Sequence, residues 1–92
     1  METLRFRLAY GINYQSFGDG EEGILLSLNS GYLYSCNAVA AMFLEGVEAE
    51  KSFGTIADRL VSTFEVNYGL ACRDLARLAE ELMDENLIER IA

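Results

Sequence analysis

The segment that most constrains the fold is 31–37, where the chain changes from extended to helical patterning. Residues 24–31 before it form an apolar run of strand length followed by turn residues. Residues 38–44 after it combine small side chains with leucine, which is typical of a buried helix, and Asn37 can cap that helix. The pattern predicts a hairpin whose second strand, 32–36, lies at the edge of a small sheet. An unpaired edge is either a liability or a binding site, and we interpret this one as a binding site.

The chain before this hairpin is also extended. Apolar and other side chains alternate over residues 4–10, the period-2 pattern of a half-buried strand. Residues 12–17 continue the strand, but the alternation is disturbed around Gly11, which indicates a bend or bulge. A glycine-rich loop is expected over 17–23. The first half is therefore predicted to be a three-stranded antiparallel sheet formed by this strand, 24–28 and 32–36.

The turn at 29–31 sets the register of the predicted hairpin. A three-residue loop with Gly31 in the left-handed position would place Leu28 opposite Tyr32 and Leu26 opposite Tyr34. The main-chain groups of Leu33 and Ser35 would then point to the open edge, whereas a two-residue loop at Ser30-Gly31 would reverse these roles.

Capping residues mark three helices in the second half. They are predicted over 38–45, ending at Gly46; over 53–64, capped by Ser52; and over 68–86, capped by Asn67 and ended by Asn86 in the left-handed conformation. Residues 87–88 then pack back, either as a short strand or as a plug. The sequence thus predicts one α+β domain, 1–92, with a three-stranded antiparallel sheet followed by three helices.

The third helix carries two apolar stripes. Ala71, Leu75, Leu78 and Leu82 fall on one line, the expected core seam. A second stripe of mostly small residues lies beside it, and two interpretations of it stay open: close packing against another helix, or a shallow groove. The stripe and the rim of that groove comprise Cys72, Ala76, Ala79 and Met83, with Arg73 and Glu80 at the rim.

Composition excludes several classes of function. The net charge of −8, with only seven Lys and Arg, argues against nucleic acid and against anionic membranes. No apolar run approaches the roughly 20 residues of a membrane span, and no signal peptide is present, so we expect a cytoplasmic protein. Two cysteines and no histidine make a metal site improbable, and no cofactor is expected. The sequence has no nucleotide-binding motif and no nucleophile elbow, so we expect no catalysis by this chain.

Several segments resemble the PqqD family, the leader-peptide recognition elements of pathways that modify ribosomally made peptides. The shared pattern begins with an apolar strand, a small turn, glycine, an aromatic pair and an asparagine, here 24–26, 29–31 and 33–37. It continues with a helix of small residues, an Ile-Ala-x-x-Leu helix at 56–60, and a last helix matched at 74–87. Cys36 stands where the family usually has leucine, and Asn86 where it has the closing glycine.

The resemblance implies a winged helix-turn-helix-like fold and a role in natural-product biosynthesis. A domain of this kind binds the leader segment of a precursor peptide as an added strand and presents it to a modifying enzyme. That enzyme would be a radical SAM protein or a leader peptidase of lasso-peptide pathways. The implied peptide-binding residues lie on the edge strand and on the third helix: Tyr32, Leu33, Tyr34, Ser35, Cys36, Cys72, Arg73, Ala76, Ala79, Glu80 and Met83.

Two other functions are compatible with the same pattern. One is a winged-helix transcription regulator, which the acidic third helix disfavours. The other is a dimerisation domain in which the edge strand 32–36 pairs with its own copy.

Overall fold

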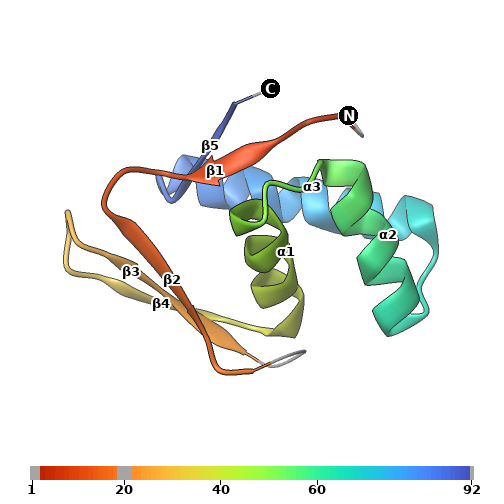
Figure 1. Cartoon of the computed structure of the whole chain (residues 1–92), viewed down its shortest axis with the longest axis horizontal. Coiled ribbons are helices and arrows are strands. Elements are labelled where there is room, and N and C mark those ends of the chain that lie inside the picture. The colour runs from red at the N-terminus through yellow and green to blue at the C-terminus, as the bar shows by residue number, and fades with distance from the viewer. Residues whose placement is uncertain (1–2, 19–21, 92) are drawn as a thin grey trace.

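The computed structural model describes residues 3–18 and 22–91, and residues 19–21 of the predicted 17–23 loop lie outside these ranges. Four strands are followed by three helices and a last strand, which is an α+β fold (Figure 1). None of the helices in the described ranges is long and apolar enough to cross a membrane. In chain order the elements are β1 (Phe6–Leu8), β2 (Ile12–Ser16), β3 (Gly23–Ser27), β4 (Leu33–Cys36), α1 (Ala38–Glu48), α2 (Phe53–Phe64), α3 (Tyr68–Asp84) and β5 (Ile88–Arg90).

The strands form two antiparallel sheets. The three-stranded sheet has the order β2-β3-β4, which confirms the prediction of such a sheet followed by three helices. The prediction of one long first strand is wrong, because β1 leaves that sheet and pairs with β5, with Phe6 opposite Arg90 and Leu8 opposite Ile88. The segment at 87–88 therefore continues as a strand.

Gly11 separates β1 from β2. Its φ is +80°, a left-handed conformation that favours glycine. The Asn29 side chain donates a hydrogen bond to the Tyr10 carbonyl at 2.9 Å, and a Cβ at Gly11 would lie only 2.7 Å from the Asn29 Nδ2. The break between the two sheets is therefore fixed by a glycine turn against the β3–β4 loop.

The predicted helix caps are all present. The side-chain oxygen of Asn37 accepts a hydrogen bond from the Ala40 amide at 2.9 Å, and Asn67 and Ser52 cap α3 and α2 in the same way. Asn86 has a φ of 60°, as predicted, although α3 ends two residues before the predicted end, at Asp84. Each cap satisfies amides at a helix start, and Asn37 does so directly after the edge strand.

The prediction that Gly46 ends the first helix is wrong. The helix α1 continues to Glu48, and Gly46 is buried within it. A Cβ at Gly46 would lie 2.6 Å from Cγ1 of Ile56, which belongs to α2. Glycine is present here because the two helices approach closely. It does not mark the end of α1, which lies at Glu48.

The core lies around α1, which is placed between the three-stranded sheet and α2 (Figure 1). Seven of the eleven residues of α1 are buried, so its position is fixed by packing on several sides. Because α1 follows β4 after a single residue, Asn37, this packing also fixes the edge strand. The largest fully buried side chains are Phe43, Phe53, Leu25, Leu44, Leu75 and Leu87.

Candidate functional site

The strand β4 has an open edge in the described structure, because β3 is its only neighbour in the sheet. The Ser27 amide donates to the Tyr32 carbonyl at 3.0 Å; Leu26 with Leu33 is the next pair along the ladder, and Leu25 with Tyr34 the one after it. Hydrogen-bonded pairs alternate in an antiparallel ladder. The main-chain groups of Leu33 and Ser35 therefore point to the open edge.

The predicted pairing of the hairpin is wrong by one residue. Tyr34 lies opposite Leu25 and not opposite Leu26, because the loop holds four residues, 28–31, and not three. The Gly31 amide donates to the Ser27 carbonyl at 2.7 Å, and Gly31 has the predicted left-handed φ, at 79°. The residues that face the open edge are nevertheless the two that were predicted, because Tyr32 still makes the first hydrogen bond to β3.

A cleft of about 470 Å³ lies between the sheet and the end of α3. From β4 it receives Tyr34, Ser35 and Cys36, so the cleft adjoins the open edge. Its floor is apolar, and the α3 side carries carboxylates. The remaining lining residues are Leu25, Ala40, Leu78, Glu81, Leu82, Asp84, Glu85 and Leu87.

Cys36 is a buried, uncharged part of this cleft. It is 4% exposed, and burial raises the pKa of its thiol above the ordinary value of 9.0. The thiolate is the reactive form of cysteine, so this side chain acts as a small apolar group at neutral pH. Cys72 is also a free thiol and is partly exposed.

The stripe of small residues on α3 does not line this cleft. Ala76, Ala79 and Met83, with Glu80, line a separate hollow of about 190 Å³. The N-terminal residues Leu4 and Phe6 form its other wall, together with Phe53 and Arg90. Cys72 packs partly buried against the core, and Arg73 is exposed. The structure therefore separates the two groups of predicted residues, and the role of the α3 group in peptide binding stays a prediction.

The α3 residues that do line the cleft are not among the predicted site residues. Periodicity predicts Leu78 and Leu82 in the core seam, yet both are only partly buried. Leu75 and Ala71, earlier on the same seam, are fully buried. Periodicity alone places these four on one stripe, and only the position of the sheet shows that the end of the stripe faces a cleft.

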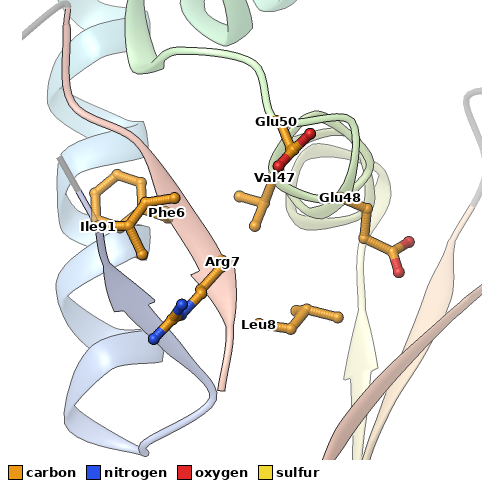
Figure 2. A pocket seen from close by; sticks show the side chains of 7 residues that line it. All are labelled: Phe6, Arg7, Leu8, Val47, Glu48, Glu50 and Ile91. Atoms are coloured by element: carbon orange, nitrogen blue, oxygen red, sulfur yellow. The ribbon is translucent and has the colours of Figure 1, made fainter. Parts of the chain in front are cut away.

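A third hollow lies between β1, β5 and the end of α1, and Figure 2 shows its lining residues. Phe6, Val47 and Ile91 provide its apolar surface, and Glu48 and Glu50 stand at the α1 side. Its one cation, Arg7, forms an ion pair with Glu89 at a distance of 2.5 Å between Nε and Oε1. The hollow therefore combines an apolar surface with two carboxylates and one paired cation.

Together these features define a small α+β domain with an open strand edge beside an apolar, acid-rimmed cleft. A sequence profile described as Coenzyme PQQ synthesis protein D (PqqD) matches residues 22–88, more than half of the chain. The chain belongs to the PqqD family, as the sequence resemblance predicted.

One solved structure shows the same fold. It is that of TbiB1 in complex with the TbiA(beta) leader peptide, and it superposes with a TM-score of 0.83 at 23% sequence identity. The match covers 94% of this chain and 98% of the TbiB1 chain. A search of curated proteins gave no match.

Proposed function

We propose that this domain binds the leader segment of a ribosomally synthesised precursor peptide and presents it to a modifying enzyme. The leader adds to β4 as a further antiparallel or parallel strand, and the domain itself performs no catalysis. The modifying enzyme is a radical SAM protein or a leader peptidase of the lasso type. The observation that carries the proposal is the position of the cleft directly beside the open edge of β4.

In this proposal the open edge of β4 provides general affinity for a peptide main chain, and the cleft provides selectivity for its side chains. The main chain of Leu33 and Ser35 supplies hydrogen bonds that any peptide sequence can form. Selectivity must therefore come from side chains, and alternate residues of an added strand point to the same face. Those that point inward would enter the cleft between Tyr34 and Leu82. Family membership and the leader-bound structure of TbiB1 support the proposal.

Two proline substitutions test strand addition. Ser35→Pro removes an amide that faces the open edge, so the domain should fold normally but lose the peptide. Tyr34→Pro removes an amide that faces β3 and should unfold the hairpin. The probe is a peptide selected with the wild-type domain from a displayed random library, its affinity measured by titration calorimetry and folding by circular dichroism.

Ser16→Pro is the matched control, because it makes the same change at the opposite edge of the same sheet, on β2. Its affinity should equal that of the wild type. Normal binding by both folded β4 variants would refute strand addition at this edge. The homodimer alternative is tested in the same samples by sedimentation, since pairing of two β4 edges predicts a dimer that Ser35→Pro converts to a monomer.

A further inference from the structure

The α3 side of the cleft is acidic. Glu81, Asp84 and Glu85 line it, all three are exposed, and none forms an ion pair with a residue in the described ranges. The opposite wall, formed by β4, contributes no charged side chain. Arg77 lies four residues before Glu81 on α3 but does not line the cleft. The cleft thus combines an apolar floor with a rim of uncompensated negative charge.

These carboxylates do not stabilise α3. The last turn of α3 has no basic residue, and negative charge at a helix C-terminus opposes the helix dipole. The chain as a whole has a net charge of −8, so distant groups add to the negative potential of the cleft. A ligand with positive charge would reduce both unfavourable interactions.

We propose that the segment bound in this cleft is a basic one: an extended peptide with apolar side chains for the Leu78–Leu82 floor and a lysine or arginine for the carboxylate rim. This inference rests on the proposed function and specifies the chemistry of the leader. Arg73, which the sequence places at the rim of a groove, does not line this cleft and adds no positive charge to it. Same-face residues on an added strand are two positions apart, so the basic residue lies two or four positions from the apolar anchor.

The test compares peptides selected from one displayed random library on three versions of the full chain. These are the wild type, the Glu81→Gln/Glu85→Gln variant, and a control, Asp58→Asn/Asp74→Asn. The control makes the same change in net charge at exposed positions outside the cleft. Wild type and control should both enrich lysine or arginine at a fixed distance from an apolar position, and the Gln variant should enrich the apolar position alone.

A synthetic peptide from the wild-type selection then gives the size of the effect. Its affinity for the Gln variant should be weaker by about 2- to 30-fold, the range for removing two solvated charge pairs, and the difference should shrink at high salt. The Gln variant should be at least as stable as the wild type, which separates a binding effect from a folding defect.

The outcomes distinguish the two proposals. Suppose that the selected peptides bind the wild type and do not bind Ser35→Pro, but show no enrichment of basic residues. That result would overturn this inference and leave strand addition intact. Peptides that bind equally well to Ser35→Pro would overturn strand addition at the β4 edge, on which the proposed function is built.

Discussion

The substitution Gly46→Ala tests how closely α1 and α2 must approach. A Cβ at this position would lie 2.6 Å from Cγ1 and 2.8 Å from Cδ1 of Ile56, both shorter than a normal carbon–carbon contact. Ile56 is 2% exposed, and the hollow that it lines together with Gly46 is small, about 100 Å³. The new methyl group must therefore displace a buried side chain or separate the two helices.

Two effects of opposite sign set the magnitude. Replacing glycine by alanine inside a helix stabilises it by about 1 kcal/mol. Overpacking a buried contact destabilises by about 1–3 kcal/mol, and two contacts below 3.0 Å place this case in the upper part of that range. We expect a net loss of about 1–2 kcal/mol in the free energy of unfolding, or a fall in Tm of about 4–16 °C for a domain of this size.

A double-mutant cycle with Ile56→Ala isolates the clash. The Ile56 Cβ is 3.7 Å from the added methyl group, an ordinary contact, so Gly46→Ala in the Ile56→Ala background should be neutral or stabilising. The coupling energy from urea unfolding should be about 1–3 kcal/mol. Gly69→Ala, at an exposed position in the first turn of α3, is the control: its Cβ would lie 3.1 Å from Oδ1 of Asn67 and would meet no buried side chain, so it should not show the destabilisation expected at Gly46. Wild-type stability of Gly46→Ala alone would refute the close approach.

Two further predictions concern the cleft and the second hollow. Ala76→Leu should fill the 190 Å³ hollow and leave affinity for the selected peptide within about twofold of the wild type; a large loss would show that the small-residue stripe of α3 binds peptide. Burial raises the pKa of Cys36, so the stability that its protonated thiol contributes is complete below pH 9.0 and is lost as the pH rises through the higher pKa of the folded state. Urea unfolding at pH 8 and pH 10 should therefore show a smaller alkaline loss of stability for Cys36→Ala, and an equal loss in both proteins would contradict this origin.

Local rules of sequence were enough to predict much of this fold. Each of the caps at Asn37, Ser52 and Asn67 depends on one side chain and on the amides two or three residues after it. A short stretch of sequence is therefore enough to predict each cap. The edge position of β4 follows from the short connection between a hairpin and α1. The residues that face its open edge follow from alternation along the strand once Tyr32 is the first residue paired with β3.

Features that depend on distant partners could not be predicted in this way. Residues 4–10 have a clear strand pattern, but nothing local shows that Phe6–Leu8 pairs with β5 and not with β3. That pairing carries the N-terminal segment across α3, so it covers Ala76 and Ala79 and leaves Leu78 and Leu82 to the cleft. Periodicity places Leu78 and Leu82 on the core seam with Ala71 and Leu75, and it does not show that only the last two residues of the seam reach the cleft.

The pairing of β1 with β5 also has a kinetic consequence. It joins Phe6 to Arg90, so forming it closes a loop of almost the whole chain, whereas the β2–β3–β4 hairpins and the helix pair α2–α3 join close neighbours in sequence. Loop-closure entropy makes such distant contacts the late ones in folding. The edge strand and its cleft can thus be assembled before the chain ends meet, and amide exchange in β1 and β5 should be faster than in β3.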